Sequence, residues 1–125
     1  MDEDVIASQV VDAAIAVHRA FGPGLLESAY VAAMEIELSE RGLTFASEVP
    51  LQGSYHGRPL GVVYRADIIV EGKLLIEAKS VRDIGDIHIA QVISYLRLAN
   101  LKLGLLLNFN VSMMKRGIKR IANSL

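Results

Sequence analysis

Apolar positions near the start of the chain recur every three or four residues, which is the spacing of an amphipathic helix. Residues 5–20 (VIASQVVDAAIAVHRA) follow this pattern, and Asp2 or Asp4 can cap the first turn. The glycine-proline-glycine of residues 22–24 ends the helix.

A second helix is predicted over residues 25–41. Gly42 follows it, and glycine is favoured at this place because it readily adopts the left-handed backbone conformation. The segment is apolar on most sides, so we expect the helix to be largely buried.

The middle of the chain changes to the pattern of strands. Residues 44–51 favour a strand, and residues 55–58 (YHGR) favour a turn. Residues 60–70 and 74–80 are rich in β-branched and apolar side chains and are joined by residues 71–73 (EGK), which predicts a hairpin.

The last third of the chain predicts a helix over residues 86–99 and an almost wholly apolar strand over residues 101–109, covered on both faces. A right-handed crossover would place this strand parallel to the one at residues 74–80. Residues 115–125 fit either a strand or a short helix. The predicted class is α/β, with a mixed sheet of four or five strands flanked by helices in the order α-α-β-β-β-α-β.

Composition narrows the class of protein. A chain of 125 residues with 52% hydrophobic and 22% charged side chains fits one globular domain, residues 1–125. The absence of cysteine excludes disulfides, zinc fingers and a thiol nucleophile. No apolar run is long enough to cross a membrane, and the acidic start MDEDVIAS is unlike a signal peptide. We therefore expect a cytoplasmic protein with no membrane partner.

The net charge of −1 does not by itself indicate a nucleic-acid-binding protein, because phosphate neutralisation usually requires a basic surface. The basic residues cluster only near the end, at Lys115, Arg116, Lys119 and Arg120. A nucleic-acid contact must then be local, assisted by a metal ion, or shared across an oligomer. We expect a homodimer, or a partner subunit, that combines such basic segments.

Two acidic residues and a lysine are candidates for a catalytic centre. Glu77 and Lys79 alternate along one strand and share a face. Asp67 falls opposite Glu77 if residues 71–73 form a three-residue connection, whereas a two-residue loop would turn Asp67 to the other face. Two neighbouring carboxylates favour a divalent cation such as Mg²⁺, beside which Lys79 can orient a water. Alternatively, Glu77 and Lys79 form only a solvated surface ion pair.

Two helices add polar groups. His88, Gln91 and Tyr95 share one face of the helix that follows this strand, where Gln91 can bond a water or phosphate and Tyr95 can contact a substrate backbone. Such a stripe is also common on surface helices without a function. Glu27 and Tyr30 lie one turn apart in the second predicted helix. Glu27 is either an acid favoured by the helix dipole, a further metal ligand, or a base that holds a water.

These residues match a known pattern. The segment from Gly24 to Tyr30 (GLLESAY) resembles the signature of the small GxxExxY proteins, which are assigned to the PD-(D/E)xK nuclease superfamily. The resemblance covers nearly the whole chain. Asp67 and Glu77-Ala78-Lys79 match the superfamily motif, with Ala66 in place of its proline, and Gln91 to Tyr95 resembles the Q-x-x-x-Y motif of the RecB-like and lambda-exonuclease-like branch.

The resemblance implies a restriction-endonuclease-like fold and a role for each residue. Glu27, Asp67 and Glu77 would bind Mg²⁺, for which Mn²⁺ can substitute, and Lys79 would act on the water. Gln91 and Tyr95 would support the substrate. The remaining candidates would contact nucleic acid: Tyr30, His88, Lys115, Arg116, Lys119 and Arg120.

Three functions are compatible with the sequence. The first is a Mg²⁺-dependent nuclease, with DNA favoured over RNA, in repair, recombination or defence. The second is a catalytically silent module that binds nucleic acid or a partner through the same fold. The third is hydrolysis of a smaller phosphate ester, for which the chain has no nucleotide-specific motif.

Overall fold

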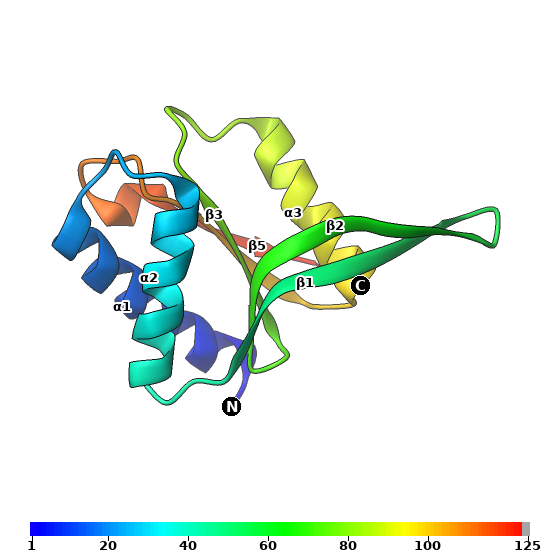
Figure 1. Cartoon of the computed structure of the whole chain (residues 1–125), viewed down its shortest axis with the longest axis horizontal. Coiled ribbons are helices and arrows are strands. Elements are labelled where there is room, and N and C mark those ends of the chain that lie inside the picture. The colour runs from blue at the N-terminus through cyan, green and yellow to red at the C-terminus, as the bar shows by residue number, and fades with distance from the viewer. Residues whose placement is uncertain (124–125) are drawn as a thin grey trace.

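The fold is a five-stranded mixed sheet between helices (Figure 1). The computed structural model describes residues 1–123. The strands pair in the order β1-β2-β3-β4-β5, which confirms the predicted class. The elements are α1 (Glu3–Phe21), α2 (Glu27–Glu40), β1 (Phe45–Tyr55), β2 (Arg58–Val70), β3 (Leu74–Lys79), α3 (Asp86–Ala99), β4 (Leu103–Asn108), the 3-10 helix η1 (Met114–Gly117) and β5 (Ile118–Ala122).

The predicted crossover is present. β3 and β4 are parallel with α3 between them in the chain, and the other strand pairs are antiparallel. Every residue of β4 is buried, as expected for an apolar strand in the interior of a sheet. This pairing fixes the strand that bears Glu77 and Lys79 in the interior of the protein.

Each side of the sheet has its own core. On one side α1 and α2 pack over the sheet through side chains such as Ile6 and Met34, together with Phe109 (Figure 1). On the other side α3 packs through Val92 and Leu96. No helix within residues 1–123 is both long and apolar enough to cross a membrane.

The helix ends follow the sequence signals. The Asp2 carboxylate accepts a hydrogen bond of 2.9 Å from the Val5 amide and caps α1. Gly42 follows α2 with a φ of 76°, and the Leu43 amide bonds back to the Leu38 carbonyl. Both predicted helix boundaries are thereby explained by local chemistry.

Two predictions need correction or completion. The expectation that α2 is largely buried was wrong: only Tyr30, Met34 and Leu38 are buried, and Ile36 is 63% exposed, because α2 contacts the protein through a single stripe. For residues 115–125, which fit either a strand or a helix, the chain forms η1 and then β5. Residues 124–125 lie outside the described part.

β1 and β2 extend beyond the rest of the sheet as a two-stranded ribbon (Figure 1). We call residues 52–63 the arm. Its tip is a two-residue turn in which His56 and Gly57 have φ values of 50° and 71°. The pairing shifts twice along the arm, between Leu51 and Gln52 and again between Gly53 and Ser54. Such bulges increase the twist of a ribbon.

Candidate active site

The connection between β2 and β3 has the register on which the predicted site depends. Val70 pairs with Leu74 and Ile68 with Ile76, so residues 71–73 form a three-residue connection and Asp67 is in register with Glu77. The backbone pairing stops there. The Asp67 carboxylate accepts a hydrogen bond of 2.9 Å from the Ala78 amide, and the Glu77 carboxylate accepts one of 3.3 Å from the Asp67 amide. Two carboxylates therefore replace the next links of the ladder.

Near Asp67, the side chains of β1 and of β2 change from one face of the sheet to the other. Ala66 packs with the α3 core although Ile68, two residues along, packs with the α1–α2 core. In a regular strand these residues would share a face. On β1 the change occurs at Glu48, whose φ of 48° is uncommon for a residue other than glycine. The local rotation places Asp67 at the boundary between the two sides of the sheet.

Glu77 is almost completely buried, with 1% of its surface exposed. Its Oε2 atom accepts a hydrogen bond of 2.7 Å from the Tyr64 hydroxyl and lies 3.9 Å from Lys79 Nζ. Burial and, secondarily, repulsion by Asp67 raise the pKa of Glu77 to about 7, despite the hydrogen bond from Tyr64 and the charge of Lys79. Burial also raises the pKa of Asp67. When both carboxylates are ionised, the surrounding hydrogen bonds and Lys79 do not fully offset their negative charge.

Tyr64 is a site residue that the sequence analysis missed. It bonds Glu77 directly and stacks on Tyr95 with ring centroids 3.8 Å apart and planes 8° from parallel. Tyr95 is 8% exposed and therefore contributes to the α3 core as well as to the site. Burial raises the pKa of both hydroxyls, so each stays protonated and able to donate. The only available signal was a tyrosine three residues before Asp67.

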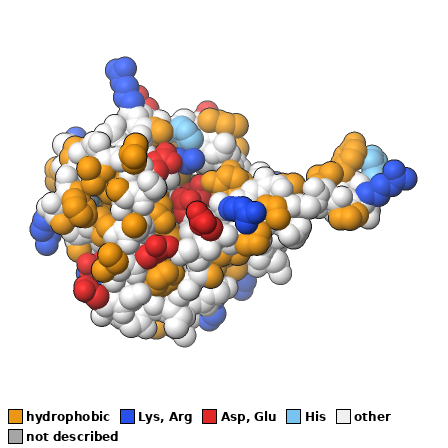
Figure 2. Space-filling view, viewed as in Figure 1, with side chains coloured by type: hydrophobic (Ala, Val, Ile, Leu, Met, Phe, Trp, Pro, Cys, Tyr) orange, Lys and Arg blue, Asp and Glu red, His pale blue; other side chains and the backbone are white. Residues whose placement is uncertain are grey.

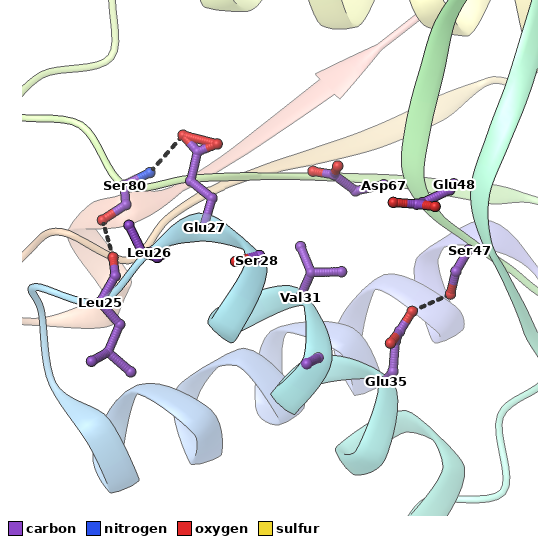
Figure 3. A pocket seen from close by; sticks show the side chains of 11 residues that line it. Leu25, Leu26, Glu27, Ser28, Val31, Glu35, Ser47, Glu48, Asp67 and Ser80 are labelled. Atoms are coloured by element: carbon purple, nitrogen blue, oxygen red, sulfur yellow. Dashed lines mark hydrogen bonds between the residues drawn. The ribbon is translucent and has the colours of Figure 1, made fainter.

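Glu27 is the first residue of α2 and lines the same pocket as Asp67. Its carboxylate accepts a hydrogen bond of 3.3 Å from the Ser80 amide, and the Ser80 hydroxyl donates to the Leu25 carbonyl (Figure 3). These residues line a pocket of about 860 Å³ whose charged side chains are all acidic: Glu27, Glu35, Glu48 and Asp67. The Glu35 carboxylate is bonded to Ser47.

The structure does not assemble the full predicted set of metal ligands. Within residues 1–123, no three carboxylate or imidazole groups converge closely enough to hold one ion. Asp67 and Glu77 lie together, whereas Glu27 is held by Ser80. Glu27 nevertheless contributes negative charge that raises the pKa of Asp67.

The remaining candidates on α3 have different surroundings. Gln91 Oε1 is buried and has no hydrogen-bond partner among the described residues, so it can accept a bond from a water or a bound ligand. His88 Nδ1 accepts a hydrogen bond of 2.9 Å from the Gly85 amide and closes the N-terminus of α3. This contact gives His88 a structural role, and its predicted contact with nucleic acid stays a prediction.

The predicted contact of Tyr30 with nucleic acid is incompatible with its position. Its side chain is completely buried and stacks on Phe109 with ring centroids 4.4 Å apart. Its hydroxyl donates to the Gly22 carbonyl at 2.6 Å and accepts from the Leu25 amide at 3.2 Å. Tyr30 therefore fixes the turn between α1 and α2, which in turn positions Glu27.

The basic segment near the end of the chain does not form one patch. Lys115 and Arg116 are exposed on η1, whereas Lys119 and Arg120 are neighbours on β5 and so point to opposite faces of the sheet. Arg120 forms an ion pair with Asp4 of α1, which offsets part of its charge. The contact of these four residues with nucleic acid stays a prediction.

Asn108 is a second residue that the sequence analysis missed. Its buried amide group accepts a hydrogen bond of 3.1 Å from the Val81 amide and donates one of 2.9 Å to the Val81 carbonyl. The Phe109 amide also bonds to the Lys79 carbonyl. These contacts fix the backbone directly after Lys79 to the end of β4.

Comparison with known families identifies the chain. A profile of the PD-(D/E)XK nuclease superfamily matches residues 4–121. The chain belongs to this superfamily. No curated protein and no solved structure matches it. The five-stranded mixed sheet flanked by helices is consistent with the restriction-endonuclease-like fold of such nucleases.

Nucleases of this superfamily typically use divalent metal ions, and the residues present fit such an ion in one respect. Asp67 is half-buried and Glu77 is buried, and both have a raised pKa, so a cation between them would relieve an unfavourable charge. Carboxylate oxygens are also the ligands that Mg²⁺ prefers. The fit extends to these two residues, with Glu27 as the nearest further acid from α2.

Proposed function

We propose that the protein is a Mg²⁺-dependent nuclease that hydrolyses phosphodiester bonds, with DNA favoured over RNA. The observation that carries this proposal is the pair formed by half-buried Asp67 and buried Glu77 beside Lys79, in a member of a nuclease superfamily. Two carboxylates in such surroundings are costly for a protein to keep unless they bind a cation or move protons.

Asp67 and Glu77 would hold the ion, with Glu27 completing the set after release from Ser80. A bound divalent ion supplies positive charge to the phosphate and lowers the pKa of a water. Lys79 Nζ lies on the Glu77 side of the pair and donates hydrogen bonds to the water or to a phosphate oxygen. Tyr64 orients the Glu77 carboxylate, and Gln91 offers a free acceptor to the substrate or its water.

Several finer assignments accompany this proposal. We place the chain in the GxxExxY group on the strength of Gly24, Glu27 and Tyr30, and near the RecB-like branch on Gln91 and Tyr95. We also propose a single domain over residues 1–125, a homodimer, a cytoplasmic location, and work in repair, recombination or defence. Mn²⁺ is expected to substitute for Mg²⁺.

The deciding experiment measures cleavage of labelled single- and double-stranded DNA and RNA with Mg²⁺, Mn²⁺ or a chelator. Asp67→Asn, Glu77→Gln and Lys79→Ala should each lower the rate by about 10³-fold, because the first two would weaken the hold on the ion and the third would remove the donor to the water or phosphate. Glu40→Gln removes an exposed acid at the far end of α2 and should leave the rate unchanged.

The second candidate function is a catalytically silent module that binds nucleic acid or a protein partner. The bonded state of Glu27 and the absence of three convergent ligands within residues 1–123 favour it. It would replace the nuclease if no substrate is cleaved and calorimetry detects no Mg²⁺ or Mn²⁺ binding. Cleavage that survives all three changes would instead refute the proposed catalytic residues.

A further inference from the structure

The arm projects from the sheet without contributing to either core. Every one of residues 52–63 except Gly53 is exposed, and Figure 1 shows the ribbon extending away from all three α-helices and η1. Tyr55, Leu60, Val62 and Val63 have exposed fractions of 68%, 61%, 44% and 45%. A two-stranded ribbon alone is only marginally stable in water, so such an extension implies a use outside the fold.

The arm and its root carry basic residues and no acidic residue. Residues 49–66 contain Arg58, Arg65 and His56 but no aspartate or glutamate, although the whole chain has 14 acidic and 13 basic residues. Neither arginine forms an ion pair within residues 1–123. In Figure 2 basic side chains appear at the tip and at the root of the projection, and the acidic ones gather on the body beside the root.

The packing of the arm explains part of its apolar surface without a protein partner. A side chain at Gly53 would come within 2.9 Å of Val63 and 3.7 Å of Leu60. These two apolar side chains therefore close over the glycine on one side of the ribbon. Part of the apolar surface of the arm is therefore in contact with the ribbon itself.

The arm is directly continuous with the proposed catalytic centre. Arg65 lies two residues from Asp67 on β2, and Tyr64 bonds Glu77. Arg65 pairs with Pro50, and Arg58 pairs with Tyr55 at the tip. Five residue steps along β1 separate the two arginines, which is about 17 Å at roughly 3.4 Å per residue. That distance matches about five base pairs of B-form DNA, at roughly 3.4 Å each.

We propose that the arm and its root bind the DNA duplex on one side of the bond that is cut, over about five base pairs from Arg65 to Arg58. The major groove of B-form DNA admits a two-stranded ribbon, whereas that of A-form RNA is too deep and narrow for side chains to read. The inference rests on the proposed nuclease function and adds to it the form of the substrate. It also gives a chain with a net charge of −1 a local contact for a polyanion, because residues 49–66 carry two arginines and no acidic residue.

The test measures fluorescence anisotropy of labelled 20-base-pair duplex DNA, duplex RNA of the same length and single-stranded DNA with Glu77→Gln protein in Mg²⁺. Adding Arg58→Ala and Arg65→Ala should weaken binding of duplex DNA about tenfold and lower the slope of log K against log salt by about 2. The matched control, Arg19→Ala with Lys102→Ala, removes the same charge from exposed sites elsewhere and should change neither quantity.

A second variant shortens the arm. Replacement of residues 52–63 by Asn-Gly joins the paired residues Leu51 and Tyr64 through a two-residue turn. This variant lacks Arg58 but keeps Arg65, so it should also weaken duplex DNA binding, while its circular dichroism spectrum shows that the sheet is retained. Equal affinities of the arm and control variants would overturn the proposal, as would equal losses for duplex DNA, duplex RNA and single-stranded DNA.

The outcomes also separate this proposal from the proposed nuclease and from a dimer contact. Arm-dependent binding of duplex DNA without any cleavage would refute the nuclease and leave the arm proposal standing. Cleavage by a protein whose DNA binding does not depend on the arm would support the nuclease and refute the arm proposal. A dimer in sedimentation that dissociates when the arm is shortened, with DNA affinity unchanged, would assign the arm to a second copy of the chain.

Discussion

The two halves of β2 differ in almost every respect. From Ala66 to Val70 the strand alternates between buried and half-buried positions inside the sheet, and its side chains contribute to both cores. From Arg58 to Val63 every residue is exposed, and the strand has only β1 as a neighbour. The side chains of the inner half are constrained because they contribute to the stability of the fold. The outer half makes little contribution to that stability, so its sequence is free to serve binding.

The largest effect that tests this comparison is a pair of matched truncations. Leu106→Ala in the fully buried strand β4 should lower the free energy of unfolding by about 3 kcal/mol, because it leaves a cavity in the α3 core. Val62→Ala on the arm should change it by less than about 0.5 kcal/mol. Urea unfolding of both variants measures the difference. Similar losses would mean that the arm is packed in solution.

An effect of comparable size concerns the charge of Glu77, which accepts a hydrogen bond from the inner half of β2. The pKa of Glu77 is raised from 4.5 to about 7, so without metal the folded state keeps a proton that the unfolded chain releases. The stability that protonation provides is fully present below pH 4.5 and is lost as the pH rises through about 7. Glu77→Gln should therefore stabilise the metal-free protein at pH 8 by about 3 kcal/mol, because the pKa rises from 4.5 to about 7 and each pKa unit corresponds to roughly 1.36 kcal/mol.

Thermal unfolding at pH 5 and pH 8 in a chelator checks this expectation. At pH 5 wild type and Glu77→Gln should melt at nearly the same temperature. Added Mg²⁺ should raise the melting temperature of the wild type at pH 8 more than that of the variant. A wild type that is equally stable at both pH values relative to the variant would show that Glu77 is not buried with a raised pKa.

The smallest effect isolates one hydrogen bond. Tyr64→Phe retains the stacking on Tyr95 but removes the donor to Glu77, which should cost about 1 kcal/mol at pH 8, where Glu77 is ionised. The cost should shrink at pH 5, and the pKa of Glu77 should rise further. Tyr55→Phe removes an exposed hydroxyl from the arm and serves as the control, with no expected change at either pH.

Much of the fold could be predicted because its signals are local. Asp2, Gly42 and the three-residue connection at residues 71–73 each act through neighbouring atoms, and all three behave as the sequence indicates. The apolar strand β4 was recognised because complete burial requires an apolar run.

The features that were missed depend on contacts distant in the sequence. Tyr64 reaches Glu77 across two strands, and α2 is exposed because only one stripe meets the sheet. The change of face at Glu48 arises from a backbone angle that no residue type announces. Tyr30 was given a role at the surface because its burial against Phe109 is set by tertiary packing. The candidate acids were found, but their surroundings were not.

The carboxylates of Asp67 and Glu77 have a mechanical consequence, since they provide the hydrogen bonds that join β2 to β3 beyond Ile68. A backbone ladder holds equally well at any pH near neutrality, but these two acceptors weaken when a proton binds them. The strand at the root of the arm is therefore joined to β3 by hydrogen bonds to two ionisable carboxylates. How firmly the arm is held against β3 depends on whether the Asp67 and Glu77 carboxylates are ionised.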